Sequence, residues 1–263
     1  MPMVDIVIRE CVAIDELDSC IRLQREVFGL PDLEISPRRH LIVSRQAGGW
    51  TLGAFVDERL VGFVHHLAAI LGTEIFGYSH MMAVDPDFQN KGVGARLKWR
   101  QRERAIQEGR SFIKWTWDPM QARNAHFNLN RLGVTVGNYA VNFYGTDYAT
   151  NPSLTNVEPA GIDSDRLFAS WQLESPRVIS LADRDFSSTE PVPVKPAAII
   201  EIPTNWTKLC REDAGQARKE QLRVRGEFQQ ALAAGLIAAG FERSSEQPRY
   251  LLYPEEVLRS VQQ

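Results

Sequence analysis

The chain has 263 residues, which is enough for one large domain or two modest ones. Its hydrophobic and charged fractions, 44% and 24%, are those of an ordinary globular protein, so we do not expect disorder of the whole chain. A net charge of -3 gives no indication of a nucleic-acid binder or of a polybasic membrane protein.

The cysteines and the apolar stretches bear on the cellular compartment. Three cysteines without metal-binding or redox spacing argue against a disulfide framework, and Cys11 and Cys20 lie in apolar contexts typical of a core. Residues 1–10 have no long apolar run, which argues against a signal peptide. The most apolar stretch, residues 60–71, is interrupted by two histidines and is far shorter than a membrane span. We therefore expect a cytoplasmic protein that does not insert into membranes.

The first part of the chain predicts strands and helices in a mixed order. In chain order these are a strand at 6–11, helices at 15–29 and 36–45, strands at 50–56, 60–71 and 78–84, a helix ending near 109, a strand at 112–117, a helix at 124–132 and a strand at 134–143. Hairpin-like strand pairs occur together with one strand-helix-strand crossover. This combination predicts an α/β fold with a mixed sheet and helices on both faces.

The second part of the chain gives weaker patterns. Residues 146–165 form a polar stretch of about twenty residues, a length typical of functional or disordered loops. The elements that follow are a strand at 166–173, a proline-rich connection at 174–196, a strand at 197–202, a helix at 212–239 capped by Gly240, and a strand at 250–253. We therefore expect two domains, a core at 1–174 and a C-terminal β-α-β extension at 175–263.

Residues 89–95, Gln-Asn-Lys-Gly-Val-Gly-Ala, follow a predicted strand and open a predicted helix. Two glycines let the backbone turn tightly and approach a ligand closely. The first amides of a helix have no internal partners, and the helix dipole favours an anion there. Lys91 adds a formal charge, and the helix carries further basic residues at Arg96, Lys98, Arg100, Arg102 and Arg104. The segment therefore predicts a site for the pyrophosphate of a coenzyme.

Other phosphate loops fit this segment poorly. A P-loop needs G-x-x-x-x-G-K-[ST], which the chain lacks, and in a Rossmann fingerprint a third glycine or alanine would replace Leu97. A glycine turn without function is the remaining alternative. The flanking strand, the turn at Pro86 and the basic helix favour a binding role, because they supply the context that the motif requires.

On these residues the sequence resembles the GNAT acyltransferases (Gcn5-related N-acetyltransferases). Their fingerprint is Q/R-x-x-G-x-G/A, and residues 89–94 match it at every fixed position. Val84-Asp85-Pro86 resembles the turn that precedes the fingerprint, and residues 124–133 resemble a later motif, a helix that begins at an asparagine and ends in Leu-Gly. The resemblance covers about residues 6–173 and implies a GNAT-type, mostly antiparallel sheet.

The resemblance implies acetyl-CoA, or another acyl-CoA, as co-substrate, without a metal. Backbone amides would bind the pyrophosphate along Gln89, Asn90, Lys91, Gly92, Val93, Gly94 and Ala95. The main chain of Met82, Ala83 and Val84 would pair with the pantetheine arm like an added strand. Asn124 would contact the pantetheine or hold the helix that lines it.

One departure concerns the catalytic acid. The family often has a tyrosine in the later motif, and the aligned residue here is Leu129. Tyr144 or Tyr139 could replace it, and solvent is a third alternative because a thiol pKa of about 8.5 makes protonation of the thiolate easy. For the base, Tyr78 and His80 share a face of the strand before the glycine loop, and His80 has a suitable intrinsic pKa.

The remaining candidates have ordinary interpretations. His65, His66 and His126 fit no metal-binding spacing and are expected to be polar or core histidines. Trp115 and Trp117 alternate on a strand, which favours core packing over an aromatic wall for an acceptor.

The sequence therefore predicts an N-acetyltransferase that transfers an acyl group, expected to be acetyl, from acyl-CoA to a primary amine by direct attack in a ternary complex. The alternative is a non-catalytic acyl-CoA-binding regulatory module. The expected partners are a small-molecule or peptide amine, with neither nucleic acid nor membrane, and a homodimer is left open. The identity of the acceptor cannot be inferred, because function depends on the site rather than on the fold.

Overall fold

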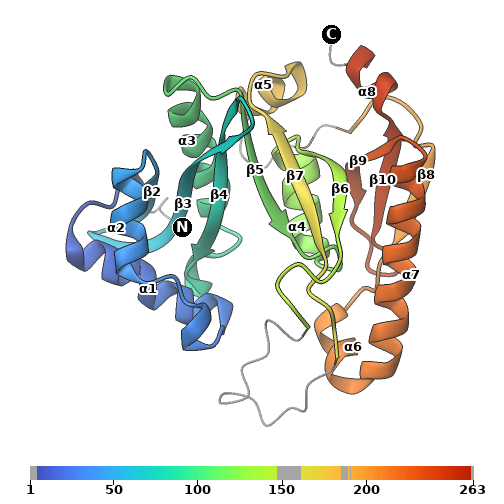
Figure 1. Cartoon of the computed structure of the whole chain (residues 1–263), viewed down its shortest axis with the longest axis horizontal. Coiled ribbons are helices and arrows are strands. Elements are labelled where there is room, and N and C mark those ends of the chain that lie inside the picture. The colour runs from blue at the N-terminus through green and yellow to red at the C-terminus, as the bar shows by residue number, and fades with distance from the viewer. Residues whose placement is uncertain (1–4, 147–160, 185–188, 190, 262–263) are drawn as a thin grey trace. The chain divides into compact units, whose positions relative to one another are not determined.

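The computed structural model describes residues 5–146, 161–184, 189 and 191–261 (Figure 1). It divides into two compact units, Met1–Lys114 and Trp115–Gln263, which are described in turn. Most of the polar stretch predicted as a loop, residues 147–160, lies outside the described residues. The predicted domain boundary between residues 174 and 175 stays a prediction.

The strands of the first unit form a sheet in the order β1-β2-β3-β4-β5. They are β1 (Val7–Glu10), β2 (Trp50–Val56), β3 (Arg59–Leu71), β4 (Glu74–Val84) and β5 (Phe112–Trp117), of which β5 crosses the division between the units. Neighbours from β1 to β4 pair antiparallel. The ladder between β4 and β5 is parallel and joins Gly77 with Ile113 and Tyr78 with Lys114. The predicted mixed, mostly antiparallel sheet is confirmed.

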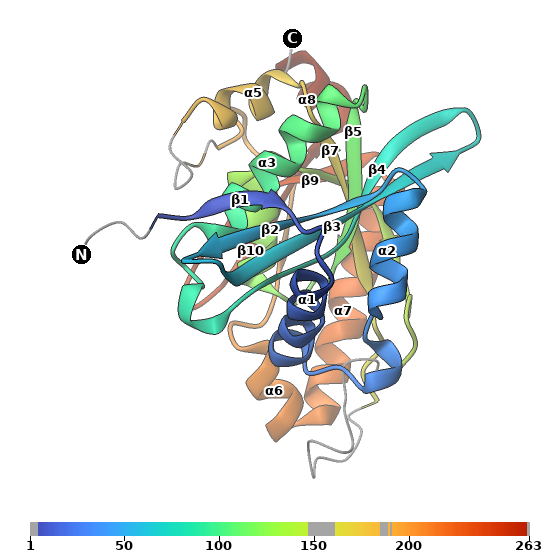
Figure 2. The same ribbon diagram turned by 90° about the vertical axis from the view of Figure 1, so that its left-hand side faces the viewer.

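Three helices cover this sheet, namely α1 (Ile14–Phe28), α2 (Arg38–Gln46) and α3 (Val93–Gln107) (Figure 2). One apolar cluster joins α3 to one face through Ile6, Trp50, Leu52, Ala54, Val61, Val64, Val93 and Leu97. The other joins α1 and α2 to the opposite face through Cys11, Leu17, Cys20, Leu23, Leu41, Phe55, Phe63 and Ala83. The predictions of helices on both faces and of core positions for Cys11 and Cys20 are confirmed.

Local sequence explains several boundaries in this unit. The Glu16 carboxylate accepts the backbone N–H groups of Val12 and Ala13, which caps the start of α1. Gly29 ends α1 in the left-handed region, with φ 61°. Asp57 and Glu58 also have positive φ values and form the two-residue turn between β2 and β3.

The strands of the second unit lie in the order β7-β6-β9-β10-β8. They are β6 (Thr135–Ala140), β7 (Arg166–Gln172), β8 (Ala198–Glu201), β9 (Leu236–Glu242) and β10 (Arg249–Pro254). The helices are α4 (Ala122–His126) with a π-helical turn (Phe127–Arg131), α5 (Pro176–Ala182), α6 (Trp206–Glu212), α7 (Ala214–Ala233) and α8 (Glu255–Val261). The long helix α7 packs along β6, β8 and β9 (Figure 1).

The predicted helix at 212–239 is wrong at its C-terminal end. The helix α7 ends at Ala233, Gly235 turns the chain with φ 77°, and Leu236–Glu242 is the strand β9. Gly240, predicted as the helix cap, instead packs against Leu251 of β10 within the sheet. Alanines favour a helix locally, and pairing with β10 overrides that preference. The predicted β-α-β order is therefore present with one additional strand.

The proline-rich connection at 174–196 is not wholly extended. Pro176 occupies the first turn of α5, where a proline is tolerated, and the helix runs to Ala182. Val178 and Leu181 are buried, and both approach Gly133 at the end of the π-helical turn. Residues 185–188 and 190 lie outside the described residues.

Candidate functional site

The glycine loop turns through two left-handed residues before α3 begins. Asn90 has φ 61° and Gly92 has φ 81°, and Gly92 is the residue that precedes the helix. Gly92 has no side chain to cap the helix, and the first main-chain bond of α3 runs from Arg96 to the Gly92 carbonyl. The amides of Val93, Gly94 and Ala95 therefore lack carbonyl partners within the helix and are oriented to bind an anion.

The two loop glycines have different surroundings. A Cβ atom on Gly92 would meet nothing within 4 Å, so a ligand can approach this backbone closely. A Cβ on Gly94 would lie 3.5 Å from Met82 Cε and 3.8 Å from Val84 Cγ2. Gly94 thus brings the start of α3 close to the C-terminal part of β4, so the anion site and this strand edge are neighbours.

The C-terminal part of β4 offers an open backbone edge. Residues 82–84 pair with β3, whereas the ladder with β5 is confined to Gly77 and Tyr78. The Asp85 amide donates to Val61 O. In an antiparallel pair, every second residue bonds to the neighbouring strand, so Ala83 bonds to β3. The main-chain groups of Met82 and Val84 therefore point away from β3. The Val84 carbonyl accepts a bond from Gln89 Nε2, 3.0 Å away. The main-chain groups of Met82 and the amide of Val84 are therefore placed to bond to an added strand, whereas those of Ala83 already bond to β3.

The basic residues of α3 contribute less charge at the loop than the sequence suggests. Lys98 is buried, and burial lowers the pKa of its amine well below the usual value. Arg96 donates to the Ile6 carbonyl, and Arg104 forms ion pairs with Glu10 and Glu108. The positive potential at the loop thus comes mainly from the helix amides and from the exposed Lys91.

His80 lies at a β-bulge. In the β3–β4 ladder His65 faces Met81 and His66 faces Ser79, which leaves His80 as the additional residue of β4. His80 Nε2 lies 3.2 Å from Ser36 Oγ in the connection between α1 and α2. The buried Gln24 of α1 holds Ser36 through both its main-chain N–H and its carbonyl. The bulge and these hydrogen bonds orient the imidazole of His80, which remains accessible to solvent.

His40 and His65 surround His80, and their ring centroids lie 5.4 and 6.0 Å from its own. Partial burial, and then the neighbouring His40, lower the pKa of His80 to about 4. His65 is fully buried between the hydroxyls of Thr51 and Ser44, at 2.8 and 3.1 Å. Its pKa is lowered to about 3, first by burial and then by His80 and His40. At neutral pH both rings are therefore uncharged.

His66 belongs to a separate buried polar chain on the α3 side of the sheet. Its ring stacks on Trp50 at 4.1 Å, and its Nδ1 lies 3.2 Å from Gln101 Nε2. Lys98 Nζ donates to Gln101 Oε1 at 2.6 Å and to Ser79 Oγ at 3.1 Å. Burial, followed by nearby cationic side chains, lowers the pKa of His66 to about 2. The prediction of core positions for His65 and His66 is confirmed.

These buried histidines should make the protein sensitive to acid. The folded pKa values of His65 and His66 lie near 3 and 2, whereas an unfolded histidine has a pKa of about 6.5. The unfolded state binds more protons below pH 6.5, so the free energy of unfolding should fall by about 1.4 kcal/mol per pH unit for each histidine. Urea unfolding at pH 7, 6 and 5 measures this slope, which His66→Gln should reduce. An unchanged slope in His66→Gln would contradict the assignment.

The second unit holds the other predicted residues. Asn124 is exposed on α4. Tyr144 is 43% exposed, with its hydroxyl 3.4 Å from Thr116 Oγ1 and with Arg166 over its ring. Leu129, which replaces the family's tyrosine, is fully buried, and its carbonyl accepts a bond from Arg177. Position 129 is therefore a core position here and cannot present an acid to a ligand.

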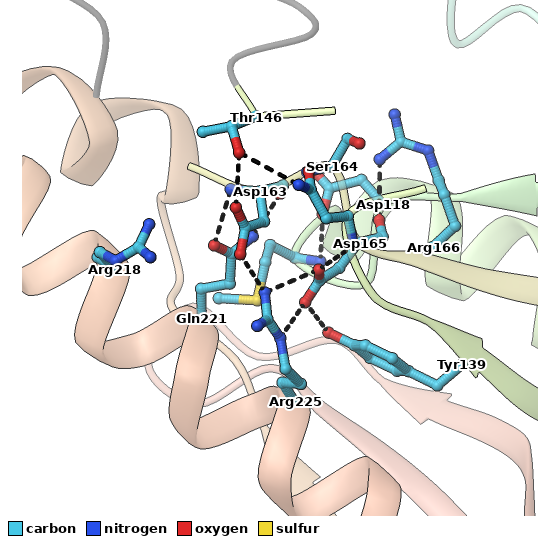
Figure 3. Close-up of polar contacts among 12 residues, drawn as sticks. Asp118, Tyr139, Thr146, Asp163, Ser164, Asp165, Arg166, Arg218, Gln221 and Arg225 are labelled. Carbon is cyan, nitrogen blue, oxygen red and sulfur yellow. Dashed lines mark hydrogen bonds and ion pairs between the residues drawn. The ribbon is translucent and has the colours of Figure 1, made fainter. Parts of the chain in front are cut away.

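Figure 3 shows a polar cluster that ties α7 to the segment before β7. Arg225 donates to both carboxylate oxygens of Asp165, at 2.8 and 2.9 Å, and to Asp163 at 2.7 Å. Tyr139 donates its hydroxyl to Asp165 at 2.5 Å. Burial and this bond raise the pKa of Tyr139 well above its usual value. The Tyr139 hydroxyl proton is therefore held in the hydrogen bond to Asp165. This bond and the raised pKa make Tyr139 a poor proton donor to a substrate.

The same cluster positions Tyr144. Asp165 accepts the amide of Asn142, and Ser164 Oγ accepts the amide of Tyr144 at 2.7 Å. Arg225 of α7 anchors Asp165 (Figure 3). The C-terminal part of the chain therefore helps to fix the backbone that carries Tyr144.

Two further observations concern ligands and membranes. Among the described residues, no group of three or more histidine, cysteine, aspartate or glutamate side chains is placed to hold a metal ion. No helix in the described ranges has the length and apolar character needed to cross a membrane.

The first unit is an α/β framework in which an uncapped helix N-terminus lies next to an open strand edge. Comparison with known families narrows this class. Residues 17–133 match the model of the acetyltransferase (GNAT) family, so the chain contains a GNAT-family domain over this range. The family resemblance inferred from residues 89–94 is thereby confirmed.

Solved structures agree on the fold. A GNAT-family protein from Desulfovibrio desulfuricans is 16% identical, with a TM-score of 0.51, and the match covers 64% of this chain and 99% of that one. The protein smu.2055 from Streptococcus mutans UA159 is 14% identical, with a TM-score of 0.50 and the same coverage, 64% and 99%. At these identities the likeness concerns the fold. A comparison with curated protein sequences found no match.

Proposed function

We propose that the protein is an acyl-CoA-dependent N-acyltransferase that transfers an acyl group, expected to be acetyl, to a primary amine. The observation that carries the proposal is the pairing of an uncapped α3 N-terminus with an open β4 edge in a GNAT-family domain. The amides of residues 93–95 would bind the pyrophosphate, and Met82 and Val84 would bond to the pantetheine arm as an added strand. Asn124 is proposed as a further coenzyme contact.

His80 is proposed as the general base. Its place in the bulge, the accessible ring and the hydrogen bond to Ser36 support this role. The amine nitrogen forms a bond to the thioester carbonyl carbon while His80 takes one amine proton. The carbon–sulfur bond then breaks, and the coenzyme thiolate takes a proton from Tyr144 or from solvent. Tyr78, which precedes His80 on the same strand, is proposed to assist the proton transfer.

Replacing His80 with alanine should lower turnover by about a hundredfold, which is the low end of the usual contribution of a general base. Coenzyme affinity should stay within twofold, because the loop amides and the β4 edge are unchanged. Release of free thiol from acetyl-CoA in an amine screen measures turnover, and calorimetry measures affinity. His126→Ala is the matched control, since His126 also has a pKa lowered to about 4, by burial and nearby arginines, but has no proposed role in transfer. Equal turnover in both variants would remove His80 from the mechanism.

The second candidate is a non-catalytic acyl-CoA-binding regulatory module. The observation that favours it is the buried Leu129 in place of the family's acid. The thiol-release screen separates the two functions, because a module of this kind binds acetyl-CoA without releasing thiol to any amine.

A further inference from the structure

The second unit contains a positively charged pocket of about 320 Å³ beside α4 and α6. Arg123 and Arg243 line it, and among the residues that the structure describes no carboxylate is part of the lining. The pocket therefore favours an anion.

Two polar side chains of the lining, Asn205 and Ser244, keep hydrogen-bond donors for a ligand. Asn205 Oδ1 already accepts the Lys208 amide at 3.0 Å, which leaves the side-chain NH₂ group for a ligand. Ser244 Oγ accepts the amides of Glu246 and Gln247, both at 3.0 Å, which leaves its O–H to donate. The Arg243 guanidinium, the Asn205 amide and the Ser244 hydroxyl match the several acceptor oxygens of a phosphate.

The pocket also has apolar walls. Met120, Trp206 and Pro248 line it and are buried, with Met120 2% and Trp206 8% exposed. Its volume lies at the lower end of the range for small-molecule sites, about 300–1,000 Å³. We propose that this pocket binds the phosphate group of a small organic phosphate, with the carbon part of that ligand against Trp206 and Met120.

The test is calorimetry with inorganic phosphate in the Gly92→Glu background, so that the glycine loop contributes no phosphate binding. Arg243→Gln and Arg123→Gln should each weaken phosphate binding by about tenfold or more. The matched control is Arg211→Gln, which removes the same charge from an exposed position of α6 outside the pocket and should leave binding unchanged. No binding of phosphate, or equal binding in Arg243→Gln and Arg211→Gln, would overturn the proposal.

A second arm, without the Gly92→Glu change, identifies the source of the phosphate. If Arg243→Gln weakens binding of CoA but not of 3′-dephospho-CoA, the pocket takes the coenzyme's own 3′-phosphate. If it weakens inorganic phosphate and leaves both coenzymes unaffected, the ligand is a separate organic phosphate. Either result supports the pocket. The first arm does not depend on coenzyme binding. The phosphate pocket can therefore be disproved without disproving the proposed transferase, and the transferase can be disproved without disproving the pocket.

Discussion

Gly92→Glu should lose at least about a hundredfold in affinity for acetyl-CoA, while the fold is retained. The residue precedes α3 at φ 81°, and a Cβ atom there would meet nothing within 4 Å, so the Cβ itself causes no clash. A carboxylate a few ångströms from a pyrophosphate is repelled by on the order of 3 kcal/mol, even in a partly aqueous site. Calorimetry with acetyl-CoA and longer acyl-CoAs measures the loss.

The control for this variant is Gly109→Glu. Gly109 has φ 76°, a Cβ on it would also meet nothing within 4 Å, and it follows the opposite end of the same helix. Both variants therefore introduce the same charge and a similar backbone strain of roughly 1–2 kcal/mol. Only Gly92→Glu should lose affinity for acetyl-CoA. A similar loss in both would indicate that strain is responsible, and no binding by the unmodified protein would exclude the loop as a coenzyme site.

Arg225→Ala should destabilise the protein by about 3–5 kcal/mol, the usual effect of removing one partner of a buried ion pair. Asp165 has a side chain 1% exposed and would be left without the guanidinium that now binds both its oxygens. Asp163, whose pKa Arg225 holds below the usual value, would also lose its partner. Urea unfolding at pH 7 measures the change.

The matched control lies two residues earlier on the same helix. Arg223 also forms two ion pairs, with Glu220 and Glu227, but its side chain is 38% exposed. Arg223→Ala should cost no more than about 1 kcal/mol, because exposed pairs are weak. Similar losses in both variants would show that helix propensity rather than the buried pair is responsible.

The glycine loop and the hairpins could be predicted because their determinants are local. The turn residues Asp57 and Glu58, the helix end at Gly29 and the loop at 89–95 each lie within a few positions of the structure that they specify. The strand β9 was missed for the opposite reason. Leu236–Glu242 is a strand through pairing with β10 and β6, which no local pattern in an alanine-rich segment reveals.

The same distinction applies to the site. His80 was identified because it precedes the loop in sequence. Gln24, Ser36 and His40 were missed because they come from α1, α2 and their connection and converge on His80 only in the folded sheet. Lys98, one of the basic residues that the sequence places on the helix after the loop, is buried and donates to Ser79. A charge pattern along one helix does not show which side chains a sheet will cover.

The pairing of β6 with β9 limits how the chain can be divided. Val136 pairs with Ala238, and Arg177 bridges the carbonyls of Leu129 and Ala239. A fragment that ends at residue 174 would leave one side of β6 without its neighbouring strand and the Leu129 carbonyl without its donor. Unprotected strand edges recruit other chains, so such a fragment should self-associate on expression. The predicted core at 1–174 is thus expected to need residues of the C-terminal extension to cover this edge of β6.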